Sequence, residues 1–390
     1  MALITTSSSQ AERIHYLDNL RALAMMLGVF LHVGLAYAQP GRHVWLATDP
    51  EGSRFVDASI WFIHLFRMSL FFWLSGYLAK MTVQRKGLQH FIKNRLLRIV
   101  LPMVIFYPVL LVLMTLVIVF AIGYVEEPQG LLGFIVEQSE AGTEKDEFRT
   151  LDTMHLWFLY YLIWFSLISV VLAKLPTIKL PKLFSSKWIL ALSPLLLAPA
   201  VVAAGVPLPA PASFIPEWWP FGFYGLFYLA GWKMYGNDLL LQALQPHGLR
   251  LLAVSLVLCI PYILIQPDLD LSTVFGESNP QPVGLTVCLG VLTAYLSALL
   301  TLTSILLGKR WLNRKSGWLS FVADSSYWVY LVHLPIAIFL QTLLIPWPVS
   351  MWIKLPLAIA GTIIPCIATY VVFVRYTPLG WLLHGKRSFP

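Results

Sequence analysis

Apolar stretches of membrane-spanning length, separated by short polar segments, follow one another along almost the whole chain. About 20 apolar residues cross a bilayer as a helix, so this pattern predicts an all-α polytopic membrane protein. Ten helices are expected, near residues 18–39, 59–80, 97–122, 155–174, 187–205, 219–235, 249–266, 284–307, 318–343 and 350–375. Prolines crowd the fifth and sixth, which are therefore the weakest of the set. No further domain is visible, so residues 1–390 are expected to form a single membrane domain.

Composition narrows the function classes. The chain of 390 residues is 58% hydrophobic and only 12% charged, whereas a soluble domain carries about 25% charged residues. Its three cysteines lie singly in apolar runs, a pattern that makes neither a disulfide framework nor a zinc site. No phosphate-binding loop is present, so ATP-driven pumping has no support.

The net charge of +8 reflects membrane topology rather than a nucleic-acid partner. Lys and Arg gather after the second, fourth and eighth spans and in the C-terminal tail. By the positive-inside rule these segments are cytoplasmic, which puts both termini in the cytoplasm. The opposite loop, 122–154, holds eight carboxylates. Residues 36–38 resemble a signal-peptidase site, but nine more spans follow, so the first span is expected to stay uncleaved.

Titratable side chains inside apolar runs are the first candidates for function, because they are costly in a membrane unless they face a partner or a wet cavity. In the first span Asp18 and Arg21 are three residues apart and can pair. His32 lies about 16 Å further along the same helix. The alternatives to a functional role are an interfacial salt bridge for the first two and a bond to a neighbouring helix for His32.

The second span contains His64 and Arg67, again three apart. Arg67 needs either a buried partner or an anionic ligand. Ser75 sits deeper, in a Ser-Gly-Tyr segment typical of close helix packing. At the start of the third span Arg95 and Arg98 share a helix face, where they act either as boundary anchors or as a phosphate clamp.

Two later spans add histidines. His155 opens the fourth at a depth similar to that of His64, and Trp157 beside it is typical of an interfacial aromatic belt. His333 lies near the middle of the ninth, before Pro335, which frees a backbone carbonyl and tends to kink the helix. The histidines thus lie in the outer half or the middle of the membrane, and the basic residues lie near its cytoplasmic face. This distribution predicts an anionic donor from the cytoplasm and a proton-handling group further out.

The same residues resemble the membrane-bound acyltransferase family 3. Its first-span signature, an arginine and a histidine separated by ten residues, is matched by Arg21 and His32, and its pair of arginines three apart by Arg95 and Arg98. The segments YLDNLRA, IHLFRMSLFFWLSGY, HLWFL and YLVHLP resemble its glucan biosynthesis protein C branch, which succinylates osmoregulated periplasmic glucans. The resemblance covers nearly the whole chain. It implies a protein of the bacterial inner membrane that transfers an acyl group from acyl-CoA to a carbohydrate hydroxyl.

The resemblance also implies roles for individual residues. His32 and Arg21 match the family's essential pair, with His32 as general base on the acceptor hydroxyl. His64 and His333 are further catalytic candidates. The donor-binding candidates are Arg95, Arg98, Arg67, Ser75 and His155, and no metal is expected.

Several alternatives stay open. The acyl group is succinyl or acetyl, and transfer is direct or through an acyl-enzyme. Ser75, Tyr330 or a second histidine could supply the oxyanion donor. The acceptor, expected to be a neutral periplasmic glucan, would meet loops 122–154 and 40–58. A proton-coupled transporter of an acyl compound or glycan is the competing function, since buried histidines and arginines are equally typical of transporters. A sensory or scaffolding role would not need histidines at this depth.

Overall fold

The computed structural model describes residues 14–39, 41–140, 152–176, 192–237, 239–267 and 282–384. Within these ranges the named elements are all helices, and the β-structure is limited to two isolated bridges. The first half contains α1 (His15–Gly34), η1 (Leu35–Tyr37), η2 (Gly41–Val44), α2 (Arg54–Lys86), α3 (Leu88–Arg95), η3 (Leu96–Val100), α4 (Leu101–Tyr124), α5 (Gly130–Glu140), η5 (Met154–Leu156) and α6 (Trp157–Lys174). The second half contains η7 (Ser193–Leu196), α8 (Ala198–Ala204), α9 (Trp219–Met234), α10 (Leu239–Leu244), η8 (Gln245–His247), α11 (Gly248–Ile265), α13 (Val283–Trp311), α14 (Gly317–Leu344), α15 (Met351–Thr369), η9 (Tyr370–Val374) and α16 (Pro378–His384).

Eight helices in the described ranges are long and apolar enough to cross a membrane. They coincide with eight of the predicted spans, which confirms an all-helical, multi-pass architecture. The two exceptions are the segments that prolines weaken. The helical stretch Ser193–Ala204 is shorter, with 187–191 of the predicted fifth span outside the described residues, and α9 has 16 residues. The total of ten spans and the side of each terminus stay predictions.

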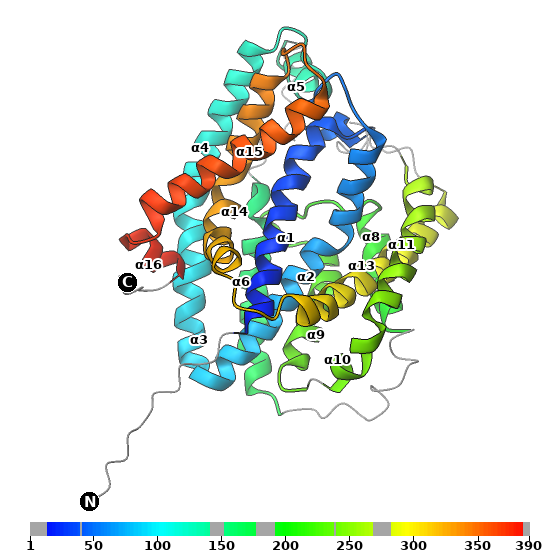
Figure 1. Ribbon diagram of the computed structural model, residues 1–390, viewed down its shortest axis with the longest axis vertical. Helices are drawn as coiled ribbons and strands as arrows, with labels where there is room; N and C mark the ends of the chain where they lie inside the picture. Colours follow the sequence, from blue (N-terminus) through cyan, green and yellow to red (C-terminus); the bar gives the residue numbers. More distant parts are fainter. Residues whose placement is uncertain are drawn as a thin grey trace, which may run out of the picture.

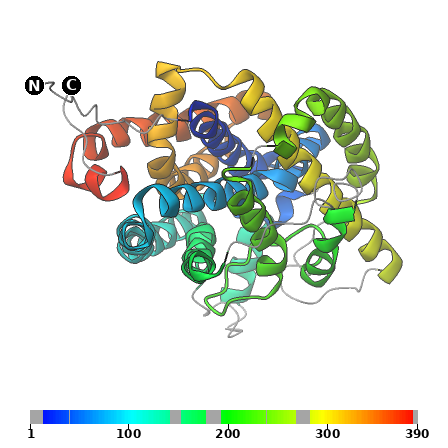
Figure 2. The same cartoon turned by 90° about the horizontal axis from the view of Figure 1, so that it is seen from below.

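The two N-terminal spans lie at the centre of the helical assembly. Figure 2 shows α1 and α2 between α4 on one side and α11 and α13 on the other. Helix α2 packs along α9, and α1 packs along α14 and α2. A Cβ on Gly76 of α2 would collide with the carbonyl of Tyr228, and one on Gly231 of α9 with the carbonyl of Trp73. The small residues therefore let two backbones touch, which confirms close helix packing at the Ser-Gly-Tyr segment.

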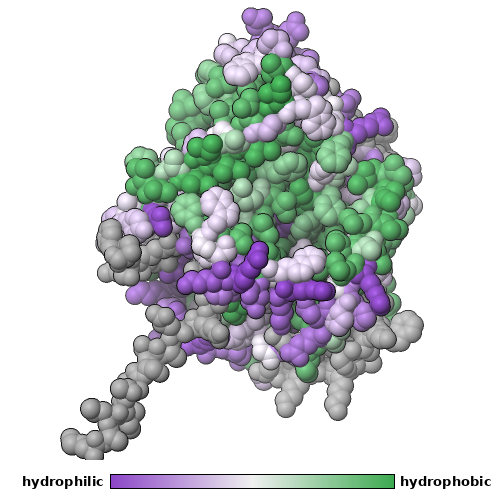
Figure 3. Space-filling view, in the orientation of Figure 1, coloured by the Kyte–Doolittle hydropathy of each residue, from purple (hydrophilic) through white to green (hydrophobic). Residues whose placement is uncertain are grey.

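The surface separates into an apolar belt and a polar end. Figure 3 shows hydrophobic residues across the middle of the molecule and hydrophilic residues gathered below them. Helices α3 and α10 lie at this lower end and α5 at the opposite one (Figure 1). Helix α4 exposes a row of large apolar side chains, including Val104, Val112, Leu116 and Val119. Such a row suits contact with lipid chains.

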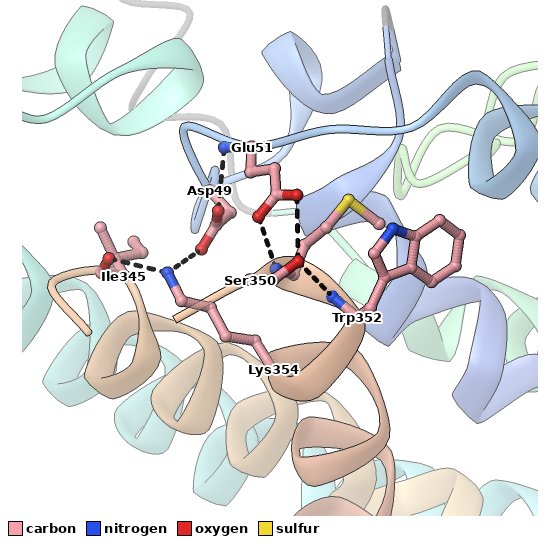
Figure 4. A network of polar contacts seen from close by, with 7 residues as sticks. Asp49, Glu51, Ile345, Ser350, Trp352 and Lys354 are labelled. Atoms are coloured by element: carbon pink, nitrogen blue, oxygen red, sulfur yellow. Dashed lines mark hydrogen bonds and ion pairs between the residues drawn. The ribbon is translucent and has the colours of Figure 1, made fainter. Parts of the chain in front are cut away.

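The connection between α1 and α2, residues 41–53, is fastened to the start of α15 (Figure 4). Lys354 Nζ lies 2.7 Å from Asp49 Oδ2, and each side chain is only 4% exposed. Glu51 accepts hydrogen bonds from the Met351 N–H (2.6 Å) and the Ser350 hydroxyl (3.1 Å). A carboxylate at a helix N-terminus satisfies N–H groups that the helix leaves free. The connection is thus held firmly over the end of the first span.

Candidate functional site

A cavity of about 1430 Å³ passes between the central helices. Its walls include Met81 and Thr82 near the C-terminal end of α2, and Val44, Trp45 and Asp152 at the opposite end. The cavity therefore extends along most of the length of the central helices. The structure brings every candidate residue from the sequence to its walls: Arg21, His32, His64, Arg67, Ser75, Arg95, Arg98, His155 and His333.

His32 faces this cavity from the upper part of α1. Its ring is stacked on the Trp45 indole, with centroids 5.7 Å apart and planes at 27°. The His333 ring lies on another side, with a centroid distance of 5.2 Å. The Nδ1 atom of His32 is buried and has no hydrogen-bond partner in the described part of the chain. The imidazole is therefore held by aromatic contacts, while its Nδ1 is not committed to another group in the described part of the chain.

His333 has a defined tautomer. Its Nδ1 lies 3.0 Å from the carbonyl oxygen of Val329 and 2.8 Å from that of Tyr330. Because a carbonyl oxygen only accepts, Nδ1 carries the hydrogen. In the neutral ring Nε2 is then a proton acceptor, so His333 brings a basic nitrogen to the side of His32.

The proline in α14 determines how His155 is held. Pro335 has no N–H, so the carbonyl of Leu331, four residues earlier, loses its helical partner. His155 Nε2 donates to this carbonyl at 3.1 Å, which confirms that the proline frees a carbonyl beside the site. His155 Nδ1 is buried and without a partner among the described residues. The Tyr330 hydroxyl donates to the His155 carbonyl at 2.6 Å, so its proton is committed, which argues against Tyr330 as oxyanion donor.

Arg67 brings a buried positive charge to the middle of the cavity. It lies within electrostatic reach of His32, His64 and His333. Its Nε is buried without a hydrogen-bond partner, and within the described ranges Arg67 forms no ion pair. An ideal Cβ on Gly28 of α1 would lie 2.5 Å from Arg67 Nη1. The guanidinium thus occupies space that only a glycine leaves, and its donors are available to an anion.

His64 lies in the wall of the cavity and is bonded to a neighbouring segment of that wall. Its Nε2 donates to the carbonyl of Leu208 at 2.9 Å, which ties residues 205–212 to α2. This contact fixes the His64 ring against that segment, and its catalytic role stays a prediction. Nearby, desolvation raises the pKa of the Asp152 carboxyl, and the hydrogen bond from the Met154 N–H (2.8 Å) acts in the opposite direction.

Arginines line the other end of the cavity. Arg21 pairs with Asp18 at 3.5 Å, as their spacing predicts, and donates to a backbone carbonyl of α14 at 3.2 Å. Arg95 ends α3, and Arg98 lies in the widened π-helical turn η3. The Tyr327 hydroxyl donates to the Arg98 carbonyl at 2.8 Å and fixes this turn to α14. The Nε atoms of Arg21 and Arg95 are buried without partners in the described segments, so donors remain for an anionic ligand.

Ser75 belongs to the arginine end. It lies eight residues beyond Arg67 on α2, about 12 Å along the helix. Since α1 and α2 are antiparallel and Gly28 faces Arg67, this displacement brings Ser75 toward the level of Arg21. Its position is compatible with a donor-binding role and argues against oxyanion stabilisation beside His32.

Sequence reasoning missed three residues and misread one. Trp45 and Gln341 contact His32, and Gly28 makes room for Arg67. Gln341 is an uncharged polar residue inside a span, a signal that could have found it. Trp157 is not a belt residue, because it is 8% exposed and packs in the interior. In the described ranges no group of His, Cys, Asp and Glu is placed to hold a metal ion.

Comparison with known proteins adds independent evidence. Residues 14–371 match the acyltransferase domain of the acyltransferase 3 family. "Glucans biosynthesis protein C" of Escherichia coli (strain K12) is 25% identical over 392 residues, which covers 96% of this chain and 95% of that protein. The protein of the same name from Salmonella typhi is 32% identical over 171 residues, 42% of this chain and 40% of that one. No solved structure gives a significant match.

Proposed function

This chain belongs to the acyltransferase 3 family, and we propose that it moves an acyl group from cytoplasmic acyl-CoA to a carbohydrate hydroxyl on the periplasmic side of the bacterial inner membrane. Family membership makes it an acyl-transferring enzyme with several membrane spans. The glucan-related relatives favour a periplasmic glucan as acceptor.

One observation carries the proposal: a single cavity joins the arginine end to His32 and its neighbouring histidines. A CoA donor has phosphates at one end and a thioester at the other, joined by a long flexible arm. Arg95 and Arg98 suit the phosphates, because guanidinium groups bind phosphate oxygens in pairs. The thioester would then reach the level of His32, where an acceptor arrives from the opposite side.

The chemistry requires a base next to the acceptor hydroxyl. His32 takes the hydroxyl proton while the acceptor oxygen bonds to the thioester carbon. The carbon–sulfur bond then breaks, and the departing thiolate receives the proton back from His32. Direct transfer of this kind needs no covalent enzyme intermediate, and the uncommitted Nδ1 of His32 suits it.

We assign the acyl group to the succinyl class because of Arg67. A buried cation without an ion pair in the described ranges is costly unless an anion meets it. The free carboxylate of a succinyl donor supplies that anion within the same cavity, whereas an acetyl group does not.

The decisive experiment combines purified protein in detergent with succinyl-CoA and a periplasmic glucan, and measures release of free CoA thiol. Acceptor-dependent release, with succinyl groups on the glucan by mass spectrometry, is expected for the wild-type protein. His32→Ala should abolish both, whereas His43→Ala, at an exposed histidine of η2 outside the cavity walls, should change neither. Full glucan acylation by His32→Ala would refute the assigned base.

The competing function is a carrier, which the length of the cavity also suits. Liposomes containing the protein distinguish the two. Uptake of succinyl-CoA or glucan without loss of the thioester would support a transporter. Thioester cleavage that requires the glucan supports the enzyme.

A further inference from the structure

Gln341 connects α14, the end of α1 and the α1–α2 connection through three hydrogen bonds. It is 1% exposed. Its Nε2 donates to the backbone carbonyls of His32 (3.1 Å) and Val33 (2.7 Å). Its Oε1 accepts from the Trp45 indole N–H at 3.0 Å. With two carbonyl acceptors on its nitrogen side and the indole donor on its oxygen side, the Gln341 amide has a single orientation. It therefore holds α14, the end of α1 and the α1–α2 connection in one geometry.

Backbone carbonyls at the C-terminal end of α1 need hydrogen-bond donors from outside the helix. Helix α1 ends at Gly34, and carbonyls in a last helical turn lack partners within the helix. Gln341 supplies hydrogens to two of them from a neighbouring span. The backbone that carries the His32 side chain is thereby fixed from outside its own helix.

The ring of His32 is held by a second residue, Trp45. Trp45 stacks on it, and the Gln341 amide sets where the indole lies. The connection that carries Trp45 is in turn fastened by the buried Asp49–Lys354 pair (Figure 4). A shift of the His32 backbone would break the bonds from Gln341, and a shift of its ring would break the stack with Trp45.

We propose that Gln341 and Trp45 are positioning residues that together hold the His32 imidazole in its reactive orientation. The inference rests on the proposed acyl transfer, in which His32 is the base. Gln341 acts through the His32 backbone and through Trp45, and neither residue is assigned contact with the reacting atoms. A base misplaced by about 1 Å lowers a rate by about 100-fold.

Three variants separate the contacts. Gln341→Leu removes all three bonds, and Gln341→Glu keeps an acceptor for Trp45 but loses the amide hydrogens. Trp45→Phe keeps an aromatic ring and loses the indole N–H. Thr342→Val and Trp352→Phe are matched controls: the first removes a buried hydroxyl bonded to Ile338, and the second changes an exposed tryptophan.

Two readouts are measured on each variant. The first is the rate of succinyl-CoA cleavage with glucan, resolved into kcat and the KM for the donor and followed against pH. We expect kcat to fall by about 10- to 100-fold in Gln341→Leu, with an unchanged donor KM, because the donor end of the cavity lies elsewhere. The second is the rate at which diethyl pyrocarbonate labels His32, read by peptide mass spectrometry, which should rise several-fold once the ring is released.

The two readouts keep this inference separate from the proposed function. If the wild-type protein cleaves no thioester, the proposed function fails, while the labelling rates still report whether Gln341 and Trp45 hold His32. Unchanged labelling of His32 in both Gln341→Leu and Trp45→Phe would overturn the inference. So would a kcat loss of equal size in the control variants.

Discussion

Gly28 on α1 and Arg67 on α2 face each other so closely that a Cβ on the glycine would lie 2.5 Å from Arg67 Nη1. The absence of a side chain at Gly28 therefore determines where the Arg67 guanidinium can lie. Because the obstructing atom is the tip of a flexible side chain, a larger residue at position 28 moves Arg67 rather than the helices.

Gly28→Ala should accordingly impair the reaction without unfolding the protein. A displaced guanidinium no longer meets the acyl group, and we expect the rate of succinyl-CoA cleavage to fall by about 10-fold or more. Gly123→Ala is the matched control, since a Cβ on that glycine of α4 meets nothing within 4 Å. Wild-type rates in Gly28→Ala would contradict the importance of this contact.

Arg67→Met tests the acyl specificity directly. A hydrogen bond to a charged group contributes about 1.5–3 kcal/mol, so loss of the guanidinium should slow succinyl transfer at least 10-fold more than acetyl transfer. The ratio of kcat/KM for succinyl-CoA and acetyl-CoA measures the effect. Equal losses for both donors would remove the assignment of Arg67 to a carboxylate.

Arg95→Ala and Arg98→Ala should weaken donor binding. Each is expected to raise the KM for succinyl-CoA while changing kcat little, and the donor KM should depend less on salt, because a charged contact to phosphate is lost. Donors with and without the 3′-phosphate show which phosphate is involved. Lys86→Ala serves as control, since this exposed lysine lies at the end of α2 outside the cavity walls.

Lys354→Met should destabilise the fold. It leaves the Asp49 carboxylate, 4% exposed, without its 2.7 Å partner. Breaking a buried pair in this way costs about 3–5 kcal/mol, which thermal unfolding in detergent would detect. The double variant Lys354→Met with Asp49→Leu should recover much of the loss. A stable single variant would show that water or another group compensates the charge.

Much of the fold follows from the sequence because membrane helices obey a simple rule of length and polarity. Eight predicted spans form helices of the required length, and the weak pair contains the prolines that shorten it. The candidate site follows for a related reason. A polar side chain in an apolar run has to face something other than lipid, so the flagged residues meet at one cavity.

The remaining features depend on contacts between distant parts of the chain. Gln341 and His32 are 309 positions apart, and no local pattern joins them. Gly28 resembles any other small residue in a span until Arg67 is placed against it. The tautomer of His155 depends on a carbonyl that a proline in another helix sets free. These features arise from the tertiary structure, and the apolar periodicity of the sequence carries no information about them.

The length of the cavity raises a problem of electrical insulation. A hollow that extends along the central helices of a membrane protein risks dissipating the ion gradients on which the cell depends. Arg67 stands in its middle with a positive charge that no carboxylate in the described ranges offsets. Such a charge repels hydronium and metal cations, as arginines do in water-selective pores. Under the proposed function, the guanidinium that attracts the anionic donor would also keep cations from crossing the membrane through this cavity.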